Sequence, residues 1–353
     1  MLGEKITALQ NYVTEQKSDG LLLASLGHEI NDSVLTYLLG YEPEQVAVLI
    51  TQDKAFLWLT PFEVTEATVK FPEFEVSPLN ASITKLVQEV LKNQKLLVRG
   101  SVLPSNLAIT LNDSGYELVQ AQNIEQIIAR KNSAEIAAMR AVCAKTDKLF
   151  AELIAHWSEF KTEQNAAKFI YRFALENNCE VSFPPIVACA ANAAEPHHQT
   201  NTTKLARGFC VIDLGLKING YCSDMSRTIF IGEPNKEECG MYDLVKKVQL
   251  DSAALVKPGA KAHEIDLACR HILGNWEKNF IHGLGHGVGT AVHEWPSISS
   301  VSQAILEQNM IITIEPGIYV PGKFGIRIED DILVTQNDAE VLNQTTKDLI
   351  IVA

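Results

Sequence analysis

The stretch that decides the fold of the second half of the chain is residues 211–227, which reads VIDLGLKINGYCSDMSR. Asn219-Gly220 stands between two runs with the composition of β-strands, and this dipeptide is the strongest short-range signal for a hairpin with a two-residue type I′ turn. Such a turn pairs Ile218 with Tyr221 and fixes the register of both strands. The stretch therefore predicts an antiparallel hairpin.

Two aspartates lie on this predicted hairpin. Its register places Asp213 opposite Ser226 and Asp224 opposite Gly215. Because side chains alternate between the faces of a strand, the two aspartates share one face as diagonal neighbours. Diagonal neighbours are about 7–8 Å apart at Cα, so both carboxylates can reach one metal ion or a pair of ions. Aspartates on a hairpin often face solvent, but the apolar flanks of this one indicate burial.

A second informative segment, residues 281–296, reads IHGLGHGVGTAVHEWP. Its histidines are His282, His286 and His293, and they stand among four glycines. Glycines allow positive φ angles and the close approach of other groups. The spacing differs from the dinucleotide-binding fingerprint, because Val288 takes the place of its third glycine. A single histidine is usually structural, whereas this cluster favours a metal or substrate site.

A third segment combines two glutamates and an arginine. Glu315 closes the apolar run 311–314, and Glu329 stands between isoleucines in another run with strand composition. If residues 321–323 form the turn, Glu315 and Glu329 face each other, and Arg327 shares the face of Glu329. The flanking isoleucines predict burial, and buried carboxylates need partners.

The three segments together supply two aspartates, two glutamates and a histidine. Four crowded carboxylates would repel one another and raise their pKa values. Two divalent cations would cancel that charge, and such a ligand set suits Mn²⁺, Co²⁺, Fe²⁺ or Zn²⁺. A water that bridges two such ions becomes hydroxide near neutral pH, and both ions can stabilise a tetrahedral oxyanion. The pattern therefore predicts hydrolysis chemistry.

Composition limits the remaining function classes. The chain has 353 residues, of which 46% are hydrophobic and 21% charged, as in ordinary globular proteins. Its 43 acidic and 30 basic residues give a net charge of −13, which argues against nucleic-acid binding. No apolar run approaches the ~18 residues of a membrane span. Residues 1–20 do not resemble a signal peptide, and seven cysteines without a CxxC pair predict reduced thiols in a cytoplasmic protein.

The first part of the chain alternates between short apolar runs and helical patterns, which indicates an α/β unit. Strands are predicted at 20–25, 46–51, 55–60 and 95–99, and helices at 2–13, 32–39, 62–70 and 81–91. At roughly 150 residues per domain, the length predicts two domains, or three. We place the domain boundary at about residue 124.

The second part has an α+β texture. Asn132 or Ser133 is predicted to cap a helix that ends near residue 157, with Glu135 in its first turn. Thr162 is predicted to cap a second helix, which ends near residue 178. Further helices are predicted at 235–256 and 261–277, and β-rich stretches at 208–231, 310–315 and 325–335.

These motifs resemble those of the pita-bread metallopeptidases, peptidase family M24, which include Xaa-Pro aminopeptidases, prolidases, methionine aminopeptidases and creatinases. The five metal ligands of that family correspond here to Asp213, Asp224, His286, Glu315 and Glu329. Residues 1–124 resemble the N-terminal domain of creatinases and prolidases, where residues 37–41, YLLGY, are similar to that domain's Y-L-T-G-F. The resemblance implies an α/β N-terminal domain followed by an α+β pita-bread catalytic domain at 125–353.

The resemblance also implies how the ligands divide between two ions. Asp224 and Glu329 would bridge both ions, and Asp213 would hold one of them. His286 and Glu315 would hold the other, and Glu315 would also act as the proton shuttle for the metal-bridging hydroxide.

Further roles follow from the same resemblance. His293 would contact the substrate carbonyl or its tetrahedral intermediate. In residues 192–198, NAAEPHH, the histidine after the proline is similar to a substrate-binding histidine of the family. We assign this role to His197, while the spacing to Asp213 keeps His198 as an alternative. His282 and Arg327 would orient the ligands.

Two departures from the family pattern bear on the substrate. Thr290-Ala291 replaces a leucine and a variable residue, and Ser297 stands where archaeal-type prolidases carry the arginine of a HEWPR stretch. A dipeptide ends in a free carboxylate beside its proline, and arginine is the natural partner for it. Ser297 has no charge, so we expect an Xaa-Pro aminopeptidase that accepts longer peptides, with an Xaa-Pro dipeptidase as the alternative.

Other readings of the family fit less well. Methionine aminopeptidases lack such an N-terminal domain, and creatinases do not keep all five ligands. A catalytically dead pita-bread module that binds proteins would not need crowded carboxylates. We therefore expect a cytoplasmic enzyme with two divalent ions per chain, Mn²⁺ first and Co²⁺, Zn²⁺ or Fe²⁺ as alternatives. Its partner would be a peptide with proline in second position, with no nucleic acid and no membrane, and the resemblance implies a homodimer.

Overall fold

The computed structural model describes the chain except residues 1, 28–31, 42–43 and 93. The chain divides into two compact units, Met1–Ile128 and Ala129–Ala353. Among the described residues, no helix has both the length and the apolar character needed to cross a membrane.

The first unit contains a six-stranded mixed sheet in the order β4-β3-β2-β1-β5-β6. Its strands are β1 (Gly20–Leu26), β2 (Gln45–Thr51), β3 (Ala55–Leu59), β4 (Glu75–Pro78), β5 (Lys95–Val98) and β6 (Glu117–Gln120). Its helices are α1 (Leu2–Glu15), α2 (Ser33–Leu39), α3 (Val64–Lys70), α4 (Ile83–Val90) and α5 (Ser105–Asp113). All predicted strands and helices of this half are confirmed, whereas β4, α5 and β6 were not predicted.

Both faces of this sheet are buried. Along β1, Leu21 and Leu23 belong to one hydrophobic cluster, while Leu22 and Ala24 belong to another on the opposite face. Strands buried on both faces consist of continuous apolar runs, which is why β1 and β2 stand out in the sequence. The short helix α6 (Glu125–Ala129) follows β6.

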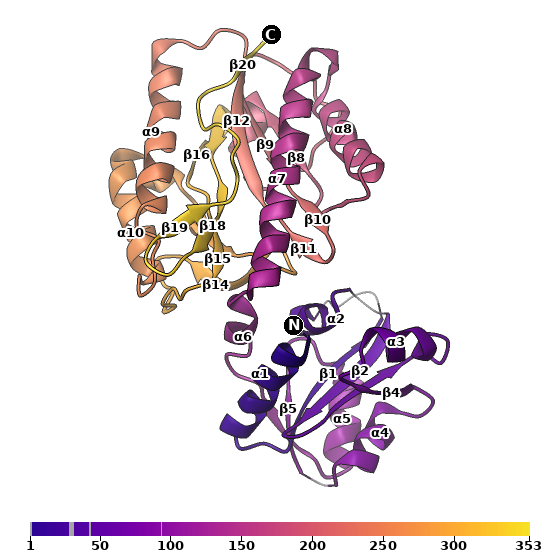
Figure 1. Ribbon diagram of the computed structural model, residues 1–353. Coiled ribbons are helices and arrows are strands. Elements are labelled where there is room, and N and C mark those ends of the chain that lie inside the picture. The colour runs from indigo at the N-terminus through magenta and orange to yellow at the C-terminus, as the bar shows by residue number, and fades with distance from the viewer. Residues whose placement is uncertain (1, 28–31, 42–43, 93) are drawn as a thin grey trace. The chain divides into compact units, whose positions relative to one another are not determined.

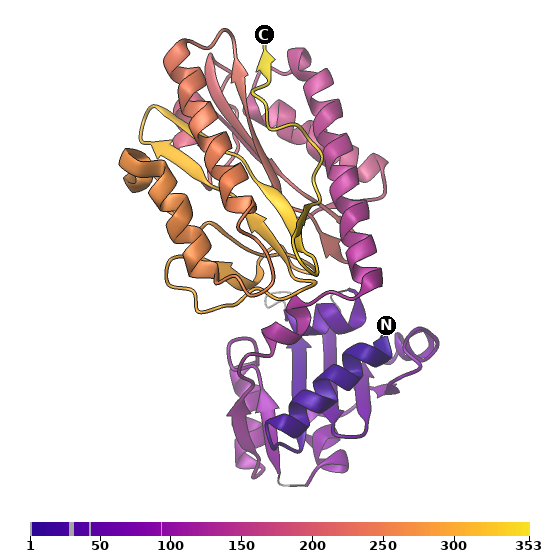
Figure 2. The same ribbon diagram turned by 60° about the vertical axis from the view of Figure 1, so that its left-hand side comes forward.

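The second unit places β-strands between two pairs of helices (Figures 1 and 2). Helices α7 (Ser133–Ala155) and α8 (Glu163–Glu176) pack against one hydrophobic cluster, and α9 (Lys236–Ala253) and α10 (Ala262–Leu273) against another. The caps are as predicted: Asn132 forms a capping box with Glu135 at the start of α7, and the Thr162 side chain caps α8. These caps fix where the helices begin.

Several small sheets form the β-layer of the second unit. One sheet has the order β20-β12-β9-β8, another β14-β13-β15-β18-β19, and two smaller ones are β11-β10-β7 and β16-β17. The strands up to β12 are β7 (Glu180–Val181), β8 (Ile186–Cys189), β9 (Gly208–Leu214), β10 (Leu216–Ile218), β11 (Tyr221–Cys222) and β12 (Met225–Ile231). The others are β13 (Gly285–Gly287), β14 (Glu294–Ile298), β15 (Ile311–Ile314), β16 (Gly317–Val320), β17 (Phe324–Arg327), β18 (Asp330–Val334), β19 (Ala339–Val341) and β20 (Ile351–Val352).

The predicted hairpin register is confirmed at both ends. Ile218 pairs with Tyr221 across a turn whose residues Asn219 and Gly220 have φ angles of 52° and 83°. Both positive angles are what a type I′ turn requires. Farther along, Asp213 pairs with Ser226. The ladder is interrupted between these two pairs, so the predicted pairing of Asp224 with Gly215 does not form.

The two chains approach closely at this interruption. A Cβ atom at Gly215 would lie 2.0 Å from the carbonyl oxygen of Ser223, so the two chains approach too closely for any side chain there. This leaves Asp224 in a short non-ladder segment between β11 and β12.

The second predicted turn is also confirmed. β16 pairs with β17 from Gly317–Arg327 to Val320–Phe324, so residues 321–323 form the connection. β15 pairs with β18 in the same register, with Ile314 opposite Asp330. Glu315 and Glu329 lie at the junction between these two ladders, as the register predicts.

One cysteine expectation is wrong. Cys189 on β8 and Cys210 on β9 are direct ladder partners and form a disulfide. The other five cysteines, all of them described by the structure, form no disulfide, and all except Cys239 are buried. The pairing comes from two strands that no local motif brings together, so the sequence alone did not suggest it.

Candidate metal centre

A cavity of about 950 Å³ opens in the second unit and is lined by all the predicted metal ligands and by the predicted catalytic and ligand-orienting residues. Those residues are Asp213, Asp224, His286, Glu315, Glu329, His197, His282, His293 and Arg327. They come from β9, β13, β17, the junctions beside β12, β15 and β18, and loops near β8 and β14. The structure therefore brings together segments more than a hundred positions apart in the chain.

Three ligand atoms in this cavity lie close enough to share one metal ion. In the described part of the chain, Asp224, His286 and Glu329 each offer an atom within 4.8 Å of the others. One oxygen each of Asp213, Asp224 and Glu329 is buried and has no hydrogen-bond partner among the residues that the structure describes. Buried carboxylate oxygens rarely stay unpaired, and a bound cation would satisfy them. The donor set thus fits a divalent metal.

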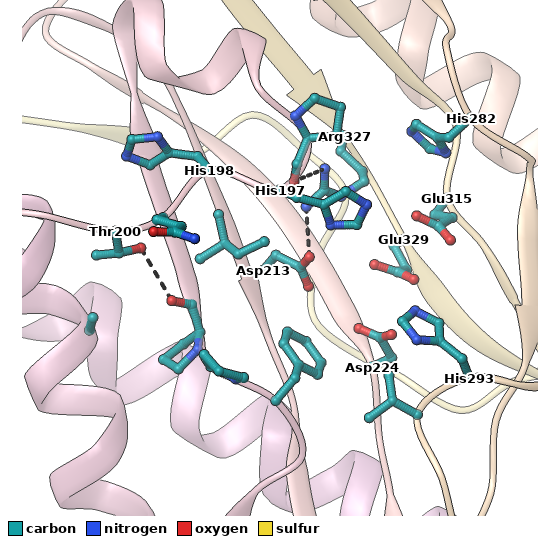
Figure 3. Close-up of a pocket in the computed structure, with 18 of the residues that line it drawn as sticks. His197, His198, Thr200, Asp213, Asp224, His282, His293, Glu315, Arg327 and Glu329 are labelled. Carbon is teal, nitrogen blue, oxygen red and sulfur yellow. Dashed lines mark hydrogen bonds and ion pairs between the residues drawn. The ribbon is translucent and has the colours of Figure 1, made fainter. Parts of the chain in front are cut away.

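Figure 3 shows the carboxylates of Asp213, Asp224, Glu315 and Glu329 in the same cavity. Their pKa values also indicate a cation site. Burial, and then the charge of Glu329, raise the pKa of Asp224 well above its ordinary value. Burial and the charge of Glu315 do the same to the pKa of Glu329. Burial raises the pKa of Glu315 to about 8. Without a cation, burial and mutual repulsion favour the protonated form of each of these groups, and a cation would reverse that preference.

His286 is prepared to act as a ligand through Nε2. Its Nδ1 donates a hydrogen bond to the carbonyl oxygen of Gly287 at 3.1 Å. Burial lowers the pKa of His286 to about 4, so its ring is neutral and Nε2 carries a lone pair. Nε2 lies 3.4 Å from Glu315 Oε1 and 3.7 Å from Asp224 Oδ2. A lone pair that faces carboxylate oxygens is repulsive unless a proton or a cation lies between them.

Arg327 is a buried cation that is hydrogen-bonded to residues of the carboxylate cluster. Its guanidinium donates to Asp213 Oδ2 at 2.6 Å, to the Ser226 hydroxyl at 2.7 Å and to the Tyr319 hydroxyl at 2.8 Å. Ser226 in turn donates to Glu329 Oε2 at 2.8 Å. Arg327 therefore orients two carboxylates, one directly and one through a serine.

His282 lies on the other side of Tyr319. Burial, and then the charge of Arg327, lower its pKa to about 4. Its Nδ1 donates to the Gly283 carbonyl at 2.7 Å, so Nε2 accepts the hydroxyl hydrogen of Tyr319 at 3.0 Å. His282 and Arg327 are therefore linked by two hydrogen bonds that share the hydroxyl group of Tyr319.

The adjacent histidines His197 and His198 differ in orientation. Figure 3 shows His197 beside Arg327, on the side of Glu329, and His198 away from the carboxylates, near Thr200. His198 Nε2 lies 2.9 Å from Glu163 Oε2, and both side chains are buried. His198 is thus held by a hydrogen bond with Glu163 of α8, while His197 faces the carboxylates.

His293 and Ser297 line the wall next to the cluster. The rings of His293 and His286 are 4.4 Å apart in a T-shaped contact, and His293 is the more exposed of the two. Ser297 pairs with His286 in the β13–β14 ladder, and its hydroxyl contacts that of Ser299 at 3.2 Å.

Several residues of the site were not predicted. Ser226 and Tyr319 link Arg327 to its neighbours, and Asp331 Oδ2 accepts the backbone N–H of Asp224 at 3.0 Å. Ser226 was detectable, because the hairpin register places it opposite Asp213. Tyr319 and Asp331 depend on tertiary packing, and no sequence signal singles them out.

Comparisons with known proteins agree with this geometry. The model of metallopeptidase family M24 matches residues 137–336, and that of the creatinase/prolidase N-terminal domain matches residues 5–142. An Xaa-Pro dipeptidase from Pyrococcus furiosus is 31% identical over 98% of this chain and 99% of its own length. The structure of an Xaa-Pro dipeptidase from Bacillus anthracis has a TM-score of 0.91 and 28% identity, with both chains fully covered.

An X-Pro aminopeptidase from Thermotoga maritima shares the fold, with a TM-score of 0.86 over 97% of this chain and all of its own, at 24% identity. These matches confirm the predicted architecture, an α/β creatinase/prolidase N-terminal domain with an α+β pita-bread catalytic domain. The chain belongs to metallopeptidase family M24.

Proposed function

We propose that this metallopeptidase is an Xaa-Pro dipeptidase, a prolidase, that hydrolyses the bond before proline. The observation that carries the chemistry is the group of buried carboxylates with unpartnered oxygens around a neutral histidine. The full-length relatives named Xaa-Pro dipeptidase support the substrate class. The sequence alone favoured an aminopeptidase, and the relatives shift that preference to the dipeptidase.

The site would hold two divalent cations, with Mn²⁺ first and Co²⁺, Zn²⁺ or Fe²⁺ as alternatives. In this proposal Asp224 and Glu329 would contribute to holding both cations, and Asp213 would help to hold one of them. His286 and Glu315 would help to hold the other. When bound, such a pair supplies a hydroxide nucleophile at neutral pH and polarises the scissile carbonyl.

The side chains around the cations would divide the remaining work. Glu315, whose carboxylate lines the cavity, would take the proton of the attacking water and pass it to the proline nitrogen. His293 would donate to the carbonyl oxygen as negative charge develops there. His197, on the carboxylate side of the cavity, would contact the substrate. Arg327 would hold the ligands in place, directly at Asp213 and through Ser226 at Glu329, and His282 would support Arg327 through Tyr319.

Xaa-Pro aminopeptidase is the second candidate, and Ser297 is the observation that favours it. A dipeptidase gains from a cation beside the proline carboxylate, and Ser297 provides none. We do not expect Arg327 to replace it, because four of its five N–H groups already donate, to Asp213, Ser226, Tyr319 and the Pro196 carbonyl. A charged hydrogen bond to a carboxylate is worth about 1.5–3 kcal/mol, or roughly 10- to 150-fold in binding.

The experiment compares kcat/KM for Ala-Pro and Ala-Pro-Ala-Ala under the same metal. A dipeptidase should prefer Ala-Pro by about tenfold or more, in line with one charged contact. Equal rates or a preference for the longer peptide would establish the aminopeptidase instead. No cleavage of either peptide in the metal-loaded enzyme would overturn both candidates.

The organisation of the whole protein is part of the proposal. Residues 1–124 would form the creatinase/prolidase-like domain and residues 125–353 the catalytic domain. We propose a cytoplasmic homodimer that acts on peptides with proline in second position and binds neither nucleic acid nor membranes. The complete ligand set weighs against a catalytically dead binding module.

A further inference from the structure

A buried ion pair lies just outside the metal cavity. Lys131 Nζ is 2.9 Å from Glu294 Oε2, and the two side chains are only 3% and 1% exposed. In the described part of the chain, neither residue lines the cavity. A buried pair costs desolvation of both charges and is weak support for stability by itself. Its place next to His293 suggests another purpose.

Glu294 organises the turn that leads to His293. Its Oε1 accepts hydrogen bonds from the Thr290 hydroxyl and from the backbone N–H of Ala291, each at 3.0 Å. One carboxylate therefore closes the turn with one oxygen and meets Lys131 with the other.

The Lys131–Glu294 pair packs closely against this turn at Gly289. A Cβ atom at Gly289 would lie 2.6 Å from Glu294 Oε2 and 2.8 Å from Lys131 Cε. The Gly289 carbonyl accepts the backbone N–H of Cys222 at 2.7 Å, which joins the turn to the hairpin that carries Asp224. The backbone of this turn is thus fixed to the metal site on one side and to the ion pair on the other.

Lys131 is itself anchored. Its backbone N–H donates to the Asn309 carbonyl at 2.9 Å, and the neighbouring Arg130 forms a β-bridge with Met310. The ammonium group therefore projects from a fixed backbone. His293, by contrast, has an exposed ring whose main described neighbour is His286, at 4.4 Å between ring centres. Its position depends on the backbone that carries it.

We propose that the Lys131–Glu294 pair positions His293 for catalysis. The inference rests on the role proposed above for His293. A misplacement of about 1 Å in a catalytic group can cost about 100-fold in rate. Removing the pair should therefore lower kcat by about 10- to 100-fold and leave KM within about threefold, because the affected contact is made mainly in the transition state.

The test is a double-mutant cycle on the full-length, metal-loaded enzyme. The variants are Lys131→Met, His293→Ala and the combination, with kcat expressed per metal-bound protein. If Lys131 acts through His293, Lys131→Met lowers kcat by about 10-fold or more alone and by less than about threefold in the His293→Ala background. Arg130→Met is the matched control, because its exposed pair with Glu307 does not touch the turn, and it should stay within about twofold of wild type.

Each outcome decides one question. An equal loss in both backgrounds, or a loss of metal in Lys131→Met, would overturn the positioning role. If His293→Ala alone leaves kcat unchanged, the proposed role of His293 fails and the inference falls with it. Should Lys131→Met fail to fold, Glu294→Gln runs the same cycle, because the amide oxygen still accepts from Thr290 and Ala291 while the ion pair is lost.

Discussion

Lowering the pH from 8 to 6 should weaken metal binding, and Glu315 should be the principal cause. In the metal-free protein the pKa of Glu315 is raised to about 8 by burial, whereas the pKa of His286 is lowered to about 4. Between pH 6 and 8, an ordinary histidine would titrate and an ordinary glutamate would not. In this site the glutamate titrates in that range and the histidine does not, because burial disfavours the charged form of each group.

The size of the effect follows from these pKa values. A cation binds the ionised carboxylate, so a proton on Glu315 must leave first. With a pKa of about 8, Glu315 is about half ionised at pH 8, about one part in eleven at pH 7 and about one in a hundred at pH 6. Glu315 alone should therefore weaken binding about fivefold from pH 8 to 7 and about 50-fold from pH 8 to 6. Asp224 and Glu329, whose pKa values are also raised, should steepen the trend.

Isothermal titration of the metal-free protein with Mn²⁺ at pH 6, 7 and 8 measures this dependence. Repeating the titration in buffers with different ionisation enthalpies gives the number of protons released, which at pH 7 should be about one or more. Glu315→Gln should bind more weakly at pH 8 and lose part of the slope, while His286→Ala should bind more weakly and keep the slope. The reasoning is refuted if the wild-type affinity changes less than about twofold across this range, or if His286→Ala rather than Glu315→Gln flattens it.

Three further predictions concern single side chains. Asp224→Asn should lose at least one of the bound ions and nearly all activity with the fold intact; unchanged metal content and rate would contradict its role. His286→Ala should lose metal, whereas His293→Ala should keep it and lower turnover by about 100-fold; equal metal content in both would erase that distinction. Gly325→Ala should lower the free energy of unfolding by about 2 kcal/mol or more, because its Cβ would lie 1.7 Å from the Ala193 carbonyl oxygen, while Gly240→Ala, a control with open space, should not.

Local signals in the sequence predicted the core of the site. The Asn219-Gly220 turn is decided by its own two residues, and the register then places Asp213 without knowledge of the rest of the fold. The capping residues Asn132 and Thr162 act within a single helical turn for the same reason. Where one short segment determines its own conformation, the sequence is sufficient.

Features that depend on distant partners escaped prediction. Cys189 and Cys210 meet because β8 and β9 pair, and no local pattern encodes that pairing. The hydroxyl of Tyr319 becomes part of the site only through His282 and Arg327. The edge strands β4 and β6 are partly exposed and less apolar than the equally short β5, so their sequences are hard to tell from loops.

The substrate preference was the least accessible conclusion. The reasoning from Ser297 concerned a single position, whereas a carboxylate can be bound by any cation that the fold brings to the cavity. The full-length relatives carry information about the whole pocket, and they favour the dipeptidase. The peptide comparison decides between the two substrates.

The wide spacing of the carboxylates along the chain has a consequence for biosynthesis. Glu329 follows Asp213 by 116 positions (329 − 213), so Asp213 is synthesised long before the complete site can exist. At the roughly 5–20 residues per second of translation, the delay is about 6 to 23 seconds. We therefore expect metal to enter a nearly finished domain and the bound ion to be one of those available at that moment. Preparations made in different growth media should carry different metals, and the activity of each should be compared only after the metal has been exchanged.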